Sequence, residues 1–204
     1  MSRIICPVCE RASKVCLCQW IEIIDNSVEL GILQHPTEVT QVKGSAKIAL
    51  LSFKCCRMWV GEDVSKLPEL MEWLKSEETI FLLYPGIENQ LEVFESFTIP
   101  EVKESYSLEK FKVLILDGTW RKTHKMMMLN SSLRGLNRIS LQPQRESTYE
   151  IRKQKNSMSL STVEAIYETY SQLEGSTQKF KPLMTAFERM QTQQLAFRKR
   201  PTED

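Results

Sequence analysis

Runs of apolar residues alternate along the chain with segments in which apolar residues recur every three to four positions. The clearest run is 113–116, which no polar residue interrupts and which stops at Asp117-Gly118. Such a run is typical of a strand that is buried on both faces of a parallel sheet. Other apolar or alternating runs, each followed by a proline, predict three further strands at 28–34, 79–84 and 136–141.

The segments with helical spacing predict five helices. We expect them at 45–57, over a short stretch from Pro68, at 119–130, from Ser161 to Gly175, and at 180–197. Ser161 and Glu164 have the spacing of a capping box, and Gly175 is typical of a helix end. Residues 88–110 are weakly patterned, and we expect a connection there with one short element at most. Strands that alternate with helices predict an α/β fold with a mostly parallel sheet and flanking helices.

The composition is that of a folded, water-soluble chain. With 204 residues, of which 42% are hydrophobic, the chain is long enough for one well-packed domain and a small appendage. No run approaches the roughly 18 apolar residues of a membrane span, and the start of the chain does not resemble a signal peptide. We therefore expect a cytoplasmic protein with reduced thiols, and in such proteins clustered cysteines usually bind metal. The neighbours Cys55 and Cys56 are expected to be ordinary buried cysteines.

Four of the six cysteines lie close to the start of the chain, in Cys6-Pro-Val-Cys9 and Cys16-Leu-Cys18. Four thiolates satisfy a tetrahedral Zn²⁺ and leave no open position, which makes such a site structural rather than catalytic. Reduced thiols without metal and disulfides are the alternatives, and disulfides do not suit a cytoplasmic chain. We predict a zinc-binding knuckle over 1–24, followed by one larger domain over 25–200.

Charge is unevenly distributed along the chain. Residues 111–160 hold ten Lys and Arg against three Asp and Glu, whereas residues 61–110 hold four against twelve. The positive segment surrounds the strand that ends at Asp117, which favours a polyanionic partner. The alternative is that the two segments form solvated faces of opposite charge.

Three of the predicted strands end in residues that could share one site. Their exits are His35-Pro36, Tyr84-Pro85 and Asp117-Gly118, and parallel strands end at the same edge of a sheet, where α/β proteins bind ligands. Asp117 alone could equally cap the following helix, and Trp120 could be either core or pocket wall. The chain has no glycine-rich phosphate loop and no serine triad order, so neither nucleotide hydrolysis nor triad chemistry is supported.

Five short motifs occur in a fixed order: His35-Pro-x-Glu38, Leu83-Tyr84-Pro85, Asp117-Gly-Thr119-Trp120, Tyr149-x-x-Arg152 and Ser161-Thr162-x-Glu164-Ala165. With the four cysteines ahead of them, they resemble the DTW-domain proteins, which are named for the Asp-x-Thr-Trp motif. The resemblance covers nearly the whole chain. The chain departs from the family pattern at Lys43-Gly44-Ser45-Ala46, where an Asn-Thr-like pair of residues is usual. Ser45 is therefore expected to supply the hydroxyl there.

The resemblance implies a SPOUT-like knotted domain that binds S-adenosylmethionine. It also implies transfer of the 3-amino-3-carboxypropyl group to N3 of a tRNA uridine, with release of 5'-methylthioadenosine. A SPOUT-like RNA methyltransferase and a non-catalytic zinc-knuckle RNA-binding protein are the alternatives. The methyltransferase would release S-adenosylhomocysteine, so the leaving product distinguishes it from the proposed transfer. The non-catalytic RNA-binding protein would not bind S-adenosylmethionine, so a binding measurement distinguishes that alternative.

The resemblance also implies roles for individual residues. Asp117 would be a general base or an orienting group, assisted by Thr119 and Trp120. The cofactor side would consist of Leu83, Tyr84, Pro85, Leu141, Leu160, Ser161, Thr162 and Ala165. The RNA side would consist of His35, Glu38, Arg121, Lys122, Tyr149, Arg152, Lys153 and Lys155. The zinc ligands would be Cys6, Cys9, Cys16 and Cys18.

Overall fold

A parallel sheet organises the chain in the computed structural model, which describes residues 4–41, 44–84, 96–141 and 160–198. Within these residues the sheet has six strands, and every neighbouring pair is parallel. The order across the sheet is β2-β1-β5-β3-β6-β4. The strands are β1 (Glu29–Gln34), β2 (Cys56–Val60), β3 (Thr79–Leu83), β4 (Ser96–Phe97), β5 (Phe111–Asp117) and β6 (Asn137–Ile139).

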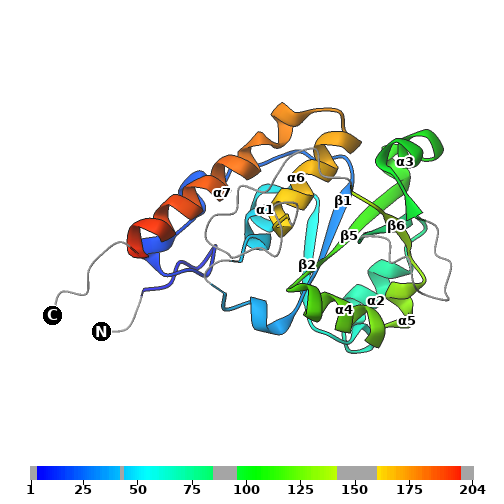
Figure 1. Cartoon of the computed structure of the whole chain (residues 1–204), viewed down its shortest axis with the longest axis horizontal. Helices are drawn as coiled ribbons and strands as arrows, with labels where there is room; N and C mark the ends of the chain where they lie inside the picture. The colour runs from blue at the N-terminus through cyan, green and yellow to red at the C-terminus, as the bar shows by residue number, and fades with distance from the viewer. Residues whose placement is uncertain (1–3, 42–43, 85–95, 142–159, 199–204) are drawn as a thin grey trace.

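Helices cover both faces of this sheet. In Figure 1, α1, α6 and α7 lie on one side of the strands, whereas α2, α4 and α5 lie on the other. The described helices are α1 (Ala46–Ser52), α2 (Pro68–Leu74), α3 (Ile99–Ser105), α4 (Trp120–Leu129), α5 (Ser131–Arg134), α6 (Thr162–Leu173) and α7 (Thr177–Arg198). The predicted α/β class, with a parallel sheet and flanking helices, is confirmed. None of the described helices is long and apolar enough to cross a membrane.

Two hydrophobic cores explain the uninterrupted apolar run in β5. Val113 and Ile115 belong to the core beneath α1, α6 and α7. Leu114 and Leu116 belong to the core beneath α2 and α4. Because successive residues of a strand point to opposite faces, a central strand with a core on each side must be apolar at every position.

The predicted helix over 45–57 is wrong in its second half. The helix ends at Ser52, and Cys56–Val60 form the edge strand β2. Of the β2 side chains only Trp59 is buried, so this strand has little apolar pattern to detect. The expected burial of Cys55 and Cys56 is also wrong: Cys55 is exposed, because it lies in the bend before this edge strand, and Cys56 is only half-buried.

Residues 88–110 contain more structure than the single short element we expected. The strand β4, the helix α3 and a 3-10 turn over Leu108–Lys110 all lie in the described part of this segment. β4 has two residues, which is too short for a period-two pattern to show in the sequence. Residues 85–95 and 142–159 lie outside the described residues, and the knot implied by the resemblance stays a prediction.

Candidate functional site

The three predicted strand exits lie next to one another. β5 occupies the middle of the sheet between β1 and β3, and all three strands run in the same direction. The backbone amide of His35 donates to the carbonyl of Asp117 at 2.9 Å, which joins two of the exits directly. As the sequence indicated, these residues meet at the carboxyl edge of one parallel sheet.

The Asp117 carboxylate is buried and accepts a hydrogen bond on each of its oxygens. The Gln34 Nε2 donates to Oδ2 at 2.8 Å, and the Thr162 Oγ1 donates to Oδ1 at 2.6 Å. Only 6% of Asp117 is exposed. Donors on both oxygens stabilise the negative charge of a buried carboxylate and fix its orientation.

The start of α6 brings Thr162 to this carboxylate. Ser161 is the N-cap of α6, and its side chain and that of Glu164 form the predicted capping box. The Ser45 Oγ accepts a hydrogen bond from the backbone amide of Val163 at 3.3 Å. The Ser45 hydroxyl therefore binds the backbone at the start of α6, and Ser45 is itself buried.

Gly118 brings the turn after β5 close to α4 and to the β1 exit. A Cβ added at Gly118 would lie 3.3 Å from the Lys122 Cβ, which is a tight contact, and 3.6 Å from the His35 Cβ, which is an ordinary one. The N-cap of α4 is Thr119, whose side chain makes no capping bond. The N-cap residue of α4 is therefore Thr119 rather than Asp117.

Trp120 is a surface residue at the first position of α4. Its side chain is 52% exposed, which excludes the alternative of core packing. Its ring meets the ring of Tyr84 edge to face, with 6.0 Å between the centroids. Tyr84 is buried at the end of β3, and this burial raises the pKa of its phenol. An aromatic pair thus stands at the strand exit next to that of Asp117.

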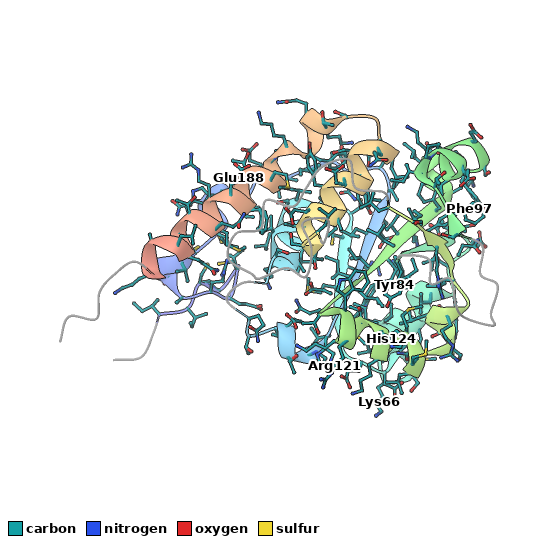
Figure 2. All side chains as sticks on the ribbon, in the orientation of Figure 1. Lys66, Tyr84, Phe97, Arg121, His124 and Glu188 are labelled. Atoms are coloured by element: carbon teal, nitrogen blue, oxygen red, sulfur yellow. The ribbon has the colours of Figure 1, made fainter. Side chains whose placement is uncertain are left out.

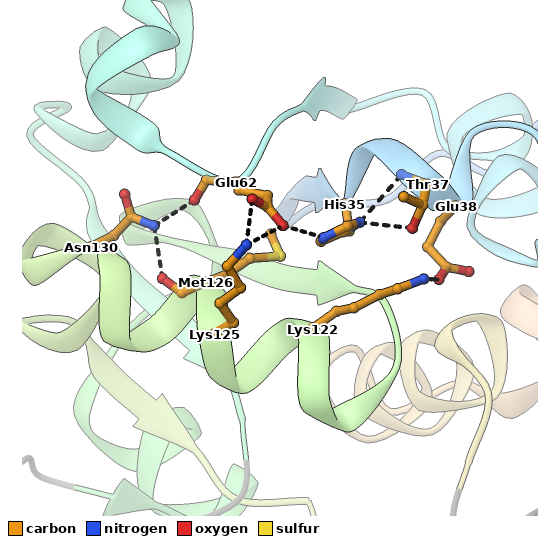
Figure 3. Close-up of polar contacts among 8 residues, drawn as sticks. All are labelled: His35, Thr37, Glu38, Glu62, Lys122, Lys125, Met126 and Asn130. Atoms are coloured by element: carbon orange, nitrogen blue, oxygen red, sulfur yellow. Dashed lines mark hydrogen bonds and ion pairs between the residues drawn. The ribbon is translucent and has the colours of Figure 1, made fainter.

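Both ring nitrogens of His35 are held by protein groups (Figure 3). The Nδ1 accepts hydrogen bonds from the backbone amide of Thr37 at 3.2 Å and from its hydroxyl at 2.9 Å. The Nε2 makes a short hydrogen bond to the Glu62 carboxylate. Because an amide can only donate, Nδ1 is the acceptor and the proton is on Nε2. His35 is therefore a buried, fully bonded histidine.

Two lysines on α4 are paired with carboxylates at neighbouring strand exits. The Lys122 Nζ lies 2.6 Å from the Glu38 Oε1, and the Lys125 Nζ lies 2.9 Å from the Glu62 Oε2. The hydrogen bond from Lys125 lowers the pKa of Glu62, and His35 adds to this effect. Arg121 and His124, both labelled in Figure 2, are exposed residues of α4.

Most predicted cofactor residues lie near the Asp117 edge, at the ends of β3 and β6 and at the start of α6. Leu83 is buried, whereas Leu141, Leu160, Thr162 and Ala165 are half-buried. The predicted residues Pro85, Tyr149, Arg152, Lys153 and Lys155 lie outside the described residues.

Gln34 and Glu62 were missed by the sequence reasoning. Gln34 carried a weak signal, as a polar residue that ends an apolar strand. Glu62 carried none, because it is one of twelve acidic residues in its segment.

The four clustered cysteines have the geometry of a metal site. Their sulfur atoms all lie within 4.8 Å of one another, with 3.6 Å between the Sγ atoms of Cys6 and Cys18 and also between those of Cys9 and Cys16. In a tetrahedron with Zn–S bonds of about 2.3 Å, the sulfur atoms are about 3.8 Å apart. All four cysteines are free, so the disulfide alternative is not realised.

The backbone around these cysteines is shaped by a tight turn. Glu10 has a φ of 58°, and its amide donates to the carbonyl of Cys6 at 2.9 Å. The backbone amides of Cys9 and Val8 lower the pKa of Cys6 to about 6, which favours a thiolate. Burial and the neighbouring thiols raise the pKa of Cys18 to about 12, and a bound cation would remove this penalty.

The cysteine cluster packs against the main body of the chain. The Lys47 Nζ lies 2.7 Å from the Glu10 Oε2, and the Gln193 Nε2 donates to the carbonyl of Lys14 at 3.2 Å. Leu17 is fully buried in the core beneath α1, α6 and α7. The cluster is therefore joined to α1 and α7 by polar and apolar contacts.

Fold and site together define an α/β protein with a polar site at the carboxyl edge of a parallel sheet and a cysteine cluster suited to a metal ion. The model of the DTW domain matches residues 3–195, so the chain belongs to the DTW-domain family. This confirms the resemblance drawn from the five motifs.

Curated relatives are similar to the chain over most of its length. It is 30% identical over 175 residues to tRNA-uridine aminocarboxypropyltransferase 2 of Macaca fascicularis, and 29% identical over 177 residues to the protein of that name from Mus musculus. The Drosophila melanogaster protein of that name is 25% identical over 177 residues. Each alignment covers 83% of this chain, but only 56% of the two mammalian proteins and 66% of the fly protein. The chain thus spans about half the length of the mammalian relatives. No solved structure matches the chain significantly.

Proposed function

We propose that the chain transfers the 3-amino-3-carboxypropyl group of S-adenosylmethionine to N3 of a uridine in tRNA. The observation that carries this proposal is the buried Asp117 carboxylate, held by Gln34 and Thr162 at the carboxyl edge of the sheet. The family and the names of the relatives supply the reaction class.

The chemistry needs an acceptor for one proton. A bond forms between N3 of uridine and the γ-carbon of the transferred group, the bond between that carbon and sulfur breaks, and 5'-methylthioadenosine leaves. S-adenosylmethionine supplies the activated carbon through its sulfonium. The proton on N3 must be lost for the nitrogen to attack, and the Asp117 carboxylate takes it or orients the uridine for its loss. The two donors keep the carboxylate in one orientation throughout.

The groups at this edge suit a cationic sulfonium ligand. The Asp117 carboxylate offers a negative charge, and the Tyr84–Trp120 pair at the next strand exit offers aromatic faces that attract cations. Leu83, Leu141, Leu160, Ser161, Thr162 and Ala165 form the side for the adenosine, together with Pro85. Thr119 orients the reacting groups through its hydroxyl.

Recognition of tRNA in this proposal is mainly electrostatic. We assign phosphate contacts to the exposed Arg121 and to Arg152, Lys153 and Lys155, and a place on the RNA side to Tyr149. His35 is buried with both ring nitrogens bonded, so it supports this side without touching RNA. Lys122 and Glu38 also belong to the RNA side, where they form an ion pair with each other. Such contacts give affinity that falls as salt rises.

Zinc in this proposal is structural. Cys6, Cys9, Cys16 and Cys18 supply four thiolates, which leaves no open position for substrate. The knuckle over 1–24 precedes a catalytic domain over 25–200, and the protein works in the cytoplasm.

The test uses the purified chain, unmodified tRNA and S-adenosylmethionine labelled in the aminocarboxypropyl group. We expect labelled aminocarboxypropyluridine in the nucleoside digest and an equal amount of methylthioadenosine. Asp117→Ala should abolish both, whereas Asp25→Ala, which removes an exposed carboxyl paired only with the exposed Lys54 among the described residues, should retain both. Release of S-adenosylhomocysteine would identify a methyltransferase instead. Binding of tRNA without any product would identify a non-catalytic RNA-binding protein.

A further inference from the structure

One carboxylate outside the five motifs joins three elements around the site. Glu62 follows β2, and its side chain accepts hydrogen bonds from the Nε2 of His35, after β1, and from the Nζ of Lys125, on α4 (Figure 3). Its side chain is 29% exposed, so the contacts are largely screened from bulk water. Glu62 thus meets the β1 exit and α4 at one point.

The backbone at Glu62 is fixed as well. The buried Asn130 donates from Nδ2 to the carbonyl of Glu62 and to the carbonyl of Met126, both at 2.7 Å. The Asn130 Oδ1 accepts from the backbone amide of Val64 at 2.7 Å. The loop after β2 is therefore hydrogen-bonded to the end of α4. These bonds fix the backbone from which the Glu62 side chain extends.

The residues that Glu62 holds lie directly against the Asp117 turn. The backbone amide of His35 donates to the Asp117 carbonyl at 2.9 Å, and a Cβ at Gly118 would lie 3.6 Å from the His35 Cβ. His35 also follows Gln34, which donates to the Asp117 carboxylate. A change in the His35 ring therefore reaches Asp117 through the backbone of His35 and through Gln34, which donates to the Asp117 carboxylate.

We propose that Glu62 is a positioning residue for the Asp117 site: by holding His35 and Lys125 together, it sets the direction of the Asp117 carboxylate. The inference rests on the proposed function, because the direction of Asp117 matters only for a reaction at this edge. Among the described residues, the Glu62 side chain bonds to His35 and Lys125 and makes no hydrogen bond to the Asp117 carboxylate or to the predicted cofactor side. It acts through His35 and α4.

Two variants distinguish the positioning role of the Glu62 side chain from the effect of its negative charge. Glu62→Ala removes every side-chain acceptor, whereas Glu62→Gln keeps an oxygen that can accept from the His35 Nε2 but loses the ion pair with Lys125. Asp63→Asn is the matched control, because Asp63 is the next carboxyl on the same loop and bonds only to Ser65 and Lys66 among the described residues. Thermal unfolding of each variant gives its folded fraction.

The first readout does not depend on activity. The chain has two histidines, so ¹⁵N spectra of the imidazole rings in a His124→Asn background report on His35 alone. We expect a single neutral form with the proton on Nε2 in the wild type and in Glu62→Gln. Glu62→Ala should give a mixture of tautomers or an exchanging ring. A His35 spectrum unchanged in Glu62→Ala would overturn the inference.

The second readout is the division of the kinetic effect between kcat and KM. We expect Glu62→Ala to lower kcat roughly ten- to a hundredfold, as for misplaced catalytic groups, with the KM for both substrates changed less than about twofold. Glu62→Gln should recover most of this loss, and Asp63→Asn should equal the wild type. An effect confined to the KM for tRNA would overturn the inference, as would an effect explained entirely by the unfolded fraction. An inactive wild-type chain would overturn the proposed function, whereas an active wild type with an equally active Glu62→Ala would overturn this inference alone.

Discussion

Gln34 and Asp117 are the last residues of β1 and β5, they lie opposite each other in the sheet, and the Gln34 amide donates to the Asp117 carboxylate at 2.8 Å. The parallel register therefore delivers one donor to the carboxylate without any loop. A second donor comes from Thr162, the first residue of α6. Because one donor belongs to the sheet and one to a helix that packs on it, the direction of the carboxylate depends on how α6 sits against β5.

Removing either donor should weaken both stability and catalysis. Gln34→Leu removes the amide that donates to the buried Asp117 Oδ2. Thr162→Val removes the hydroxyl that donates to Oδ1. We expect each to cost about 1–3 kcal/mol of unfolding free energy, because a buried charged acceptor loses a partner. Urea unfolding measures the cost. The kcat should fall in both variants, and the KM should change little in Gln34→Leu.

The double variant tests whether the two donors act as one unit. Because they serve the same carboxylate, their effects should not be additive, and the coupling should be about 0.5–3 kcal/mol. Thr192→Val, at an exposed threonine of α7, is the control for the loss of a hydroxyl. Additive effects in the double variant, or a kcat unchanged in both single variants, would contradict the assignment.

The cysteine cluster should hold one zinc ion that stabilises the fold. Cys9→Ser should lower the zinc content measured by mass spectrometry and lower the Tm, because structural zinc binding is folding free energy. Cys55→Ser is the matched control, because Cys55 is exposed and lies outside the cluster. A strong chelator should lower the Tm of the wild type to that of Cys9→Ser. A purified wild type that contains no zinc, and whose Tm a chelator does not change, would refute the site.

The central sheet could be predicted because its position forces the pattern. Val113 and Leu114 enter opposite cores, so β5 must be apolar throughout, and such a run is visible in any sequence. β2 could not be predicted in this way. It is an edge strand with one buried side chain, Trp59, so its residues follow no strand period, and the helical spacing predicts that the preceding helix extends to residue 57.

The site could be predicted in its centre but not in its surroundings. Asp117 stands out because it ends an apolar strand. Its donors Gln34 and Thr162 are 83 and 45 residues away, and no local spacing relates them to it. Glu62 meets His35 only because β2 lies beside β1 in the sheet, and β2 was itself missed. Side chains that meet through strand order cannot be recognised before that order is known.

Trp120→Ala should separate ligand binding from folding. With 52% of the side chain exposed, the change should cost about 1 kcal/mol of stability through the lost contact with Tyr84. Affinity for S-adenosylmethionine, measured by calorimetry, should fall up to about tenfold, and Trp120→Phe should restore most of it. Leu129→Ala, which is 52% exposed on the same helix, should leave the affinity unchanged. Equal affinity for S-adenosylmethionine in the wild type and in Trp120→Ala would show that Trp120 is not part of the ligand site.

Glu62 should make the stability of the chain sensitive to acid. Its pKa is below the usual value in the folded state, so the carboxylate stabilises the fold above the ordinary glutamate pKa of about 4.3, and this contribution disappears as the pH falls through the lower folded value. Glu62→Gln should therefore lose stability at pH 7 and show a flatter decline in Tm between about pH 5 and 3. Glu69→Gln, at an exposed carboxyl on α2, is the charge-matched control. Parallel declines for Glu62→Gln and wild type would contradict the pairing.

Arg121 and Lys122 are neighbours on α4 but should respond differently to tRNA. Arg121 is exposed, whereas the Lys122 ammonium is neutralised by Glu38 at 2.6 Å. In a plot of log Kd against log salt concentration, Arg121→Ala should reduce the slope by about 0.7–0.9, the value of one phosphate contact, and Lys122→Ala should reduce it less. Glu38→Gln releases the lysine and should steepen the slope. Equal reductions for Arg121→Ala and Lys122→Ala, with no effect of Glu38→Gln, would mean that tRNA displaces Glu38 and takes the lysine as a phosphate contact.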